Sequence, residues 1–318
     1  MIHAAAELLR RGGLVVFPTE TVYGLGADAL RLASVNRVFE AKGRPADNPL
    51  IVHVASLDQV LDSVMYIPSM AQPLIEKFWP GPLTLVMKAA EIIPENVTAG
   101  LDTVAIRMPD HPVALELIRA LGSGIVGPSA NRSGRPSPTT AQHVLADLDG
   151  RVEMILDAGH TDIGVESTVL DVTGDRPVVL RLGGLSLERI TAVVGHVERP
   201  HTDEELRRSP GTRHRHYAPR ARVILIPSGD AEALKAAMAD ASAAGQLAAC
   251  LVKSISLPAT PAVRFRRLSE DIHQFAHELF AALRELDDLQ VDRIIVESVP
   301  EDGLGAAVMD RLRRASIG

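Results

Sequence analysis

LVVFPTETVYGLGA, residues 14–27, sets the architecture of the first half of this chain. Leu14–Phe17 is a short apolar run that predicts a buried strand, and Pro18 ends it. Hydroxyl groups, one carboxylate and two glycines follow at once, and a loop of this kind after a buried strand suits a small polar ligand. A strand-to-helix connection with capping threonines explains the same residues equally well, so both interpretations stay open.

Short apolar runs and helical segments continue to alternate outward from this stretch. Further strands are predicted at residues 50–54, 83–87, 103–108, 152–156, 167–172 and 178–182. Helices are predicted at residues 2–11, 32–41, 70–79, 113–121, 141–148 and 187–194. This pattern predicts an α/β domain over residues 1–195.

A change in composition at residues 196–220 predicts an interdomain linker, because this segment is polar, punctuated by proline and rich in His and Arg. The pattern restarts in residues 221–318. Strands are predicted at 223–226, 247–252 and 293–296, and helices at 231–244, 269–286 and 306–314. Strands that alternate with helices predict a smaller, Rossmann-like domain with a parallel sheet.

The composition is that of an ordinary globular protein, with 318 residues, 46% of them apolar. One cysteine, Cys250, excludes an internal disulfide and fits a reducing compartment. No apolar run approaches the roughly 20 residues that span a bilayer, and the first residues do not resemble a signal peptide. We therefore expect a cytoplasmic protein without membrane contact. The net charge of −7 argues against a dedicated nucleic-acid binder.

Four cations stand on or beside apolar strands: Lys42, Arg44, Arg107 and Arg181. Surface charges seldom distribute in this way, so a pocket for a polyanion is indicated. Lys42 and Arg44 suit an oligophosphate, although a solvated basic loop is the commoner fate of such a pair. Arg107 shares a strand face with Thr103, and its anion is either a structural carboxylate or the carboxylate of a substrate.

Several common sites are disfavoured by the sequence. It contains no G-x-x-x-x-G-K-[ST] phosphate loop, and the G-x-G-x-x-A match at residues 24–29 stands too far beyond its strand for a dinucleotide site. His273 and His277 lack a third metal ligand. Cys250 lies in an apolar run that is typical of a core. The loop at residues 127–138 is rich in small residues that allow close backbone approach to a ligand, or it is a plain turn.

Together, these segments resemble the L-threonylcarbamoyladenylate synthase family in its long, two-domain form, with a YrdC-like catalytic domain. The similar segments are PTETVYGLG (18–26), KGRP (42–45), NPLIVH (48–53), WPGPLT (79–84), VAIRMP (104–109), PSAN (128–131), ESTV (166–169), SPG (209–211), HYAP (216–219), GLG (303–305) and MDR (309–311). The resemblance implies a twisted mixed sheet with helices in the first domain. It also implies a nucleotidyltransferase that joins L-threonine, bicarbonate or CO2, and ATP into threonylcarbamoyl-AMP and pyrophosphate for the t6A modification of tRNA.

The same resemblance implies roles for individual residues. L-threonine would be held by Thr21, His53, Arg107, the backbone at Gly127, and Ser167. ATP would be held by Arg44, Asn48, Thr103, Ser129, Ser137, Arg181 and Tyr217. Lys42 and Arg44 would be the catalytic residues at the phosphates. Mg²⁺ would arrive with the nucleotide and not in a protein cage. Tyr217 would place the linker over the nucleotide as a lid.

The expected partners are the substrates and the machinery that transfers the threonylcarbamoyl group, with weak or indirect binding of tRNA. The sequence leaves three alternative functions. An RNA-binding module is disfavoured by the net charge and by the 3% content of aromatic residues. A related carbamoyl-adenylate enzyme with another acceptor is disfavoured by the threonine-pocket motifs. A nicotinamide oxidoreductase is the most distant alternative.

Overall fold

The computed structural model describes residues 1–210, 217–256 and 264–317, and these fall into two compact units. The first unit comprises described residues within 1–133, 138–162 and 166–213, and the second those within 134–137, 163–165 and 214–318. Two short segments that precede residue 166 in the chain thus belong to the second unit. None of the described helices has the length and apolarity that a membrane crossing requires.

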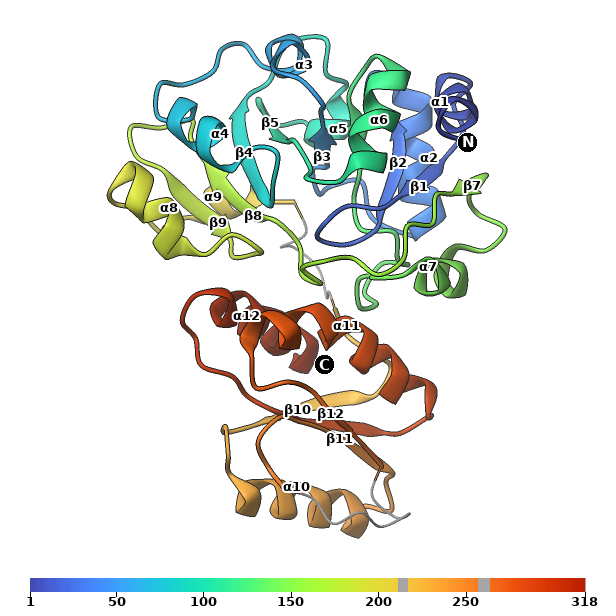
Figure 1. Cartoon of the computed structure of the whole chain (residues 1–318), viewed down its shortest axis with the longest axis vertical. Helices are drawn as coiled ribbons and strands as arrows, with labels where there is room; N and C mark the ends of the chain where they lie inside the picture. Colours follow the sequence, from blue (N-terminus) through green and yellow to red (C-terminus); the bar gives the residue numbers. More distant parts are fainter. Residues whose placement is uncertain (211–216, 257–263, 318) are drawn as a thin grey trace. The chain divides into compact units, whose positions relative to one another are not determined.

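The first unit is built on a twisted mixed sheet of nine described strands in the order β7-β1-β2-β6-β3-β5-β4-β8-β9 (Figure 1). The strands are β1 (Val15–Phe17), β2 (Gly24–Asp28), β3 (Ile51–His53), β4 (Leu83–Lys88), β5 (Thr103–Arg107), β6 (Ile125–Val126), β7 (Met154–Ile155), β8 (Thr168–Asp171) and β9 (Val178–Arg181). The neighbours β1/β7, β3/β5 and β4/β8 are parallel, and the other pairs are antiparallel.

Helices connect these strands. They are α1 (Ile2–Arg10), α2 (Leu32–Lys42), α3 (Leu57–Ser63), α4 (Gln72–Phe78), α5 (Glu95–Thr98), α6 (Pro112–Leu121), α7 (Ala141–Leu148), α8 (Leu187–Val194) and α9 (Asp203–Arg207). Helix α9 lies within the predicted linker, where Thr202 and Glu205 form a capping box that starts it. Residues 211–216 of that linker lie outside the described residues.

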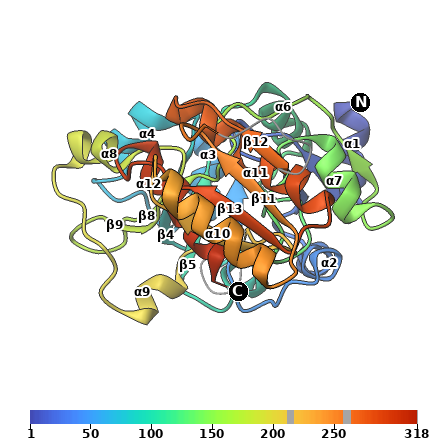
Figure 2. The same ribbon diagram turned by 90° about the horizontal axis from the view of Figure 1, so that it is seen from below.

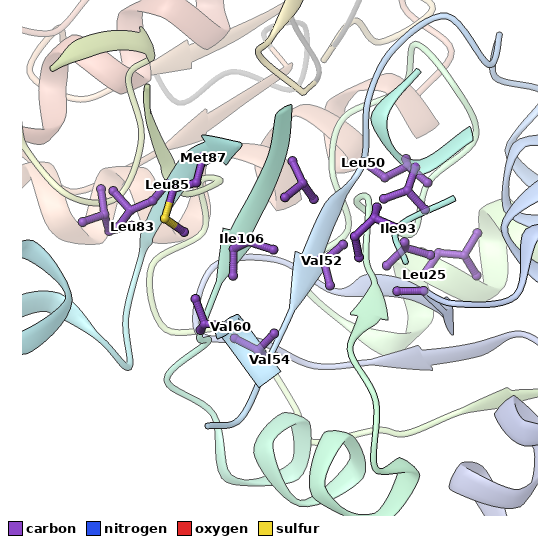
Figure 3. Close-up of a cluster of buried hydrophobic side chains, with 14 of the residues drawn as sticks. Leu25, Leu50, Val52, Val54, Val60, Leu83, Leu85, Met87, Ile93 and Ile106 are labelled. Carbon is purple, nitrogen blue, oxygen red and sulfur yellow. The ribbon is translucent and has the colours of Figure 1, made fainter. Parts of the chain in front are cut away.

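The main core of the first unit lies on one face of the sheet. Because successive strand residues point to opposite faces, Val52 and Ile106 enter this core with Leu25 and Leu85, as Figure 3 shows. Helices α2, α4, α7 and α8 contribute buried apolar side chains to it.

The opposite face of the sheet carries two smaller groups. Helices α1 and α6 cover β1 and β6 with a separate apolar cluster that includes Phe17. Further along the sheet, Ile51, Ala105 and Leu180 belong to a small cluster on the strands β3, β5 and β9. By strand alternation, His53 and Arg107 lie on this second face as well. The predicted site residues of β3 and β5 are therefore placed on the side of the sheet away from the main core.

The second unit has a parallel sheet of four described strands in the order β10-β13-β11-β12. Its elements are β10 (Arg222–Ile226), α10 (Ala231–Ala243), β11 (Ala248–Val252), β12 (Arg264–Arg267), α11 (Ile272–Asp288), β13 (Arg293–Glu297) and α12 (Leu304–Ser316). Helix α10 packs on one side of this sheet and α11 and α12 on the other (Figure 1), and Figure 2 shows α10 in front of it. The predicted parallel α/β domain is confirmed.

Cys250 and Glu297 are two ionisable side chains that are buried in the second unit. Cys250 is fully buried in the core between the sheet and α10, as predicted, and burial raises its pKa to about 11. At the end of β13, the buried carboxylate of Glu297 accepts hydrogen bonds from the main-chain N–H groups of Gly229 (2.9 Å), Lys253 (2.8 Å) and Ser254 (3.1 Å). Burial by itself would raise the pKa of Glu297, but a hydrogen bond from the hydroxyl of Ser254, together with these main-chain N–H groups, lowers it to about 2.

Candidate functional site

Arg107, the last residue of β5, is the centre of a buried polar group. Its Nη1 donates to Thr21 Oγ1 (3.0 Å), its Nε donates to the carbonyl of Gly81 (3.1 Å), and its Nη2 lies 2.6 Å from Glu20 Oε1. Arg107 is 3% exposed and Glu20 is 5% exposed. Of the two anions considered for this arginine, a structural carboxylate is present, and Thr21 is brought into the same group.

His53 lies beside Arg107, because β3 and β5 pair in parallel with these two residues in register. Gly127 faces the imidazole so closely that a Cβ there would stand 2.7 Å from His53 Nδ1 and 2.8 Å from Phe17 Cζ. Burial and the positive charge of Arg107 lower the pKa of His53 to about 3. The ring is therefore neutral near pH 7 and acts as a hydrogen-bonding group without charge.

Ser167 and Arg181 form a second polar group. Arg181 ends β9, and its Nε and Nη2 donate to the carbonyl of Ser167 at 3.2 and 2.9 Å. Its Nη1 donates to the carbonyl of Pro210 at 2.9 Å. The hydroxyl of Ser167 lies 2.7 Å from that of Thr84 on β4. The ends of β4, β8 and β9 thus bring together one predicted threonine ligand and one predicted ATP ligand.

Lys42 ends α2, and Gly43 stops the helix there in the left-handed conformation (φ 60°). Its buried ammonium donates to the carbonyl of Ser129 and, at 2.6 Å, to that of Asn131. Burial and the positive charge of Arg44 lower the pKa of Lys42 well below its ordinary value. Lys42 therefore holds the loop that carries Ser129, a contact that its sequence position did not reveal.

Arg44 and Asn48 come together on the loop after α2. Arg44 Nη2 donates to the carbonyls of Asn48 and Pro49, both at 3.0 Å. Arg44 is buried and Asn48 fully so. Thr103, at the other end of β5 from Arg107, is buried too. These three of the predicted ATP ligands are thus buried side chains of the first unit, and Arg44 is not a solvated surface cation.

The two remaining predicted ATP ligands belong to the second unit. Ser137 is fully buried there. The ring of Tyr217 stacks on Phe280 with 5.6 Å between centroids, and the guanidinium of Arg311 lies 5.0 Å from its centroid. The lid role of the linker stays a prediction.

Among the described residues, no group of three His, Cys, Asp or Glu side chains comes together that could hold a metal ion, and this includes His273 and His277. A cavity of about 490 Å³ opens elsewhere in the first unit. It is lined by residues such as Val52, Gln59 and Ile93, and none of the predicted site residues borders it. We assign this cavity no role.

Sequence reasoning missed Glu20 as a site residue. It noted one carboxylate in the loop at residues 18–27 without giving it a partner. The available signal was a charged residue between two threonines directly after a buried strand, since a charge so placed needs a counter-ion.

Comparison with known proteins agrees with this arrangement. The family model described as telomere recombination, for Sua5, YciO and YrdC proteins, matches residues 7–183. The model described as the C-terminal domain of threonylcarbamoyl-AMP synthase matches residues 185–316.

The G-x-G-x-x-A segment of the dinucleotide alternative is strand β2 and not a phosphate loop.

Relatives match over the full length. The threonylcarbamoyl-AMP synthase of Pyrococcus abyssi is 48% identical over 99% of this chain and 94% of its own length. That of Bacillus subtilis is 46% identical over 100% and 93%. The crystal structure of Pyrococcus abyssi Sua5 complexed with L-threonine superposes with a TM-score of 0.93, at 47% identity, over 99% of this chain and 94% of that one. The chain therefore belongs to the Sua5 family of two-domain threonylcarbamoyl-AMP synthases.

Proposed function

We propose that this chain is an enzyme that forms threonylcarbamoyl-AMP and pyrophosphate from L-threonine, bicarbonate or CO2, and ATP. The observation that carries the proposal is the full-length similarity to synthases of that name, two of them at 46–48% identity. The buried polar groups around Arg107 and Arg181 support it, because Arg107 contacts Thr21 and Arg181 contacts Ser167, two further residues with predicted substrate roles.

The threonine end of the site would be the group around Arg107. Its guanidinium would bind the α-carboxylate through a charge-assisted contact. Thr21, already bonded to Arg107, and the neutral ring of His53 would supply hydrogen bonds without charge. The backbone at Gly127 would approach the ligand closely, and the hydroxyl of Ser167 would complete the set.

The nucleotide end would use the other predicted residues. In the first unit these are Arg44, Asn48, Thr103, Ser129 and Arg181. The roles of Ser137 and Tyr217 stay predictions from the family resemblance. Lys42 would act in catalysis with Arg44. Because the ammonium of Lys42 already holds the carbonyls of Ser129 and Asn131, its contribution would include fixing that loop for the phosphates.

In the proposed reaction, the free amine of threonine adds to CO2 and releases a proton, which gives a carbamate. A carbamate oxygen attacks the α-phosphorus of ATP, and pyrophosphate leaves. Positioning of the reactants and stabilisation of the phosphate charges would supply most of the rate, so no covalent enzyme intermediate is needed. Mg²⁺ would be bound as part of the nucleotide complex and would neutralise phosphate charge.

The test is pyrophosphate release from ATP and bicarbonate, with L-threonine, L-serine or glycine, and identification of the adenylate by mass spectrometry. We expect release that depends on threonine. The variant Arg107→Met should lose it, while Arg176→Met, which removes a cation that is 69% exposed from the same unit, should keep it. Release that is indifferent to the amino acid, or an adenylate without a threonylcarbamoyl group, would contradict the proposal.

The cellular setting is also proposed from the family. The product would pass to the machinery that transfers the threonylcarbamoyl group to tRNA in the cytoplasm. Binding of tRNA itself would be weak, because a net charge of −7 repels phosphates. A titration of tRNA at two salt concentrations checks this, and tight binding with a steep salt dependence would contradict it.

A further inference from the structure

The ion pair between Glu20 and Arg107 is buried but incompletely hydrogen-bonded. Arg107 Nη2 lies 2.6 Å from Glu20 Oε1. Within the described part of the chain, however, neither oxygen of Glu20 and no hydrogen of Nη2 makes a hydrogen bond of good geometry. Buried charged groups are costly in this state, and nearly all buried polar atoms in proteins have partners. The pair therefore has the capacity to bind a polar ligand.

The neighbouring hydroxyl groups do not donate hydrogen bonds to the carboxylate of Glu20. Thr19 donates its one hydroxyl hydrogen to the carbonyl of Val22 at 2.7 Å, so Thr21, 2.7 Å away, donates its own to Thr19. Thr21 in turn accepts from Arg107 Nη1. Both threonines beside Glu20 thus donate their hydroxyl hydrogens elsewhere, so neither donates to Glu20, and its carboxylate has room to accept from a ligand.

An α-amino acid carries a cation and an anion on one carbon atom, which matches an acceptor and a donor that lie side by side. We propose that Glu20 is a specificity-determining residue whose carboxylate accepts the α-ammonium of the substrate, while Arg107 binds its α-carboxylate. This inference rests on the proposed function, in which the substrate is L-threonine. It makes the site selective for an amino acid over the same acid without its α-amino group.

Isothermal titration of the full chain without ATP tests the inference. The ligands are L-threonine and 3-hydroxybutyrate, which keeps the carboxylate and hydroxyl of threonine but lacks its amino group. The wild type should prefer threonine. Glu20→Gln should weaken threonine binding about tenfold or more, the range of a charge-assisted hydrogen bond, and should leave 3-hydroxybutyrate binding unchanged or tighter. Glu20→Asp, which keeps the charge, should retain part of the preference.

Each contrary outcome has a separate meaning. If Glu20→Gln weakens the binding of both ligands by the same factor, Glu20 only positions Arg107 and the inference is wrong. Equal affinity of the wild-type protein for the two ligands overturns it as well, and this measurement does not require the variant to fold. If the wild type does not bind threonine at all, the proposed function fails and takes the inference with it.

Discussion

Replacing Arg107 with methionine should destabilise the first unit by about 3–5 kcal/mol, the usual cost of leaving one member of a buried ion pair without its partner. The structure places this pair in that class, because Arg107 and Glu20 are 3% and 5% exposed and their charged atoms lie 2.6 Å apart. Removing both charges together, in Arg107→Met with Glu20→Gln, should cost less than the sum of the two single changes. We expect a coupling energy of at least about 2 kcal/mol.

The assay is urea unfolding followed by tryptophan fluorescence. Trp79 is the one tryptophan of the chain, and it lies in the main core of the first unit, where its indole donates to the carbonyl of Leu83 at 2.7 Å. Its signal therefore reports unfolding of that unit and not of the second. The matched control is Arg176→Met, which breaks an exposed pair with Glu198 and should cost less than about 1 kcal/mol.

Two results would refute this reasoning. One is a change of less than about 1 kcal/mol for Arg107→Met, which would place the pair with ordinary surface pairs. The other is a double variant whose cost equals the sum of the single variants, which would mean that the two charges do not interact in the folded protein.

Three further predictions concern other contacts. Gly127→Ala should cost about 1–3 kcal/mol by overpacking against His53 and raise the threonine KM, as urea unfolding and steady-state kinetics would show; wild-type values for both would contradict the close approach. Because the pKa of His53 falls from 6.5 to about 3 on folding, the unfolded chain binds the extra proton between these values. The free energy of unfolding of the first unit should therefore decrease as the pH is lowered from 6.5 to about 3, by up to about 1.4 kcal/mol per pH unit. The decrease should be steeper in the wild type than in His53→Gln, and parallel pH profiles of the two proteins would contradict this. Glu297→Gln should lower the free energy of unfolding of the second unit by about 2 kcal/mol and speed amide hydrogen exchange at Lys253 and Ser254. Unchanged exchange would show that hydrogen bonds to this carboxylate do not protect the two amides.

Much of the secondary structure follows from apolar periodicity, and helix α8 occupies the residues predicted for it. Strand β2 does not, because a segment with two glycines in three residues is typical of a loop. The structure supplies the reason for the glycines. A Cβ at Gly24 would lie 2.9 Å from Phe17 Cζ, and one at Gly26 would lie 2.6 Å from the carbonyl oxygen of Val15. The pairing of β1 with β2 thus requires glycine, a condition that only tertiary packing reveals.

The candidate site shows the same division. The sequence correctly indicated that Arg107 meets an anion, because an arginine in an apolar strand is costly to bury alone. It left open which anion, since Glu20 reaches Arg107 only through the pairing of distant segments. For Lys42 the sequence suggested phosphate, whereas the structure shows contacts to carbonyls nearly ninety residues further along the chain, at Ser129 and Asn131. Residue types predicted the chemistry, but partners depended on the fold.

The carboxylate of Glu297 has a consequence for what the second unit can bind. In doubly wound domains, phosphate groups of nucleotides bind at the carboxyl ends of parallel strands, on free main-chain N–H groups. Here the N–H groups of Gly229, after β10, and of Lys253 and Ser254, after β11, are already bonded to the chain's own anion. A phosphate at this position would have to displace a buried negative charge. In the second unit these main-chain N–H groups are thus already taken by a carboxylate of the chain itself.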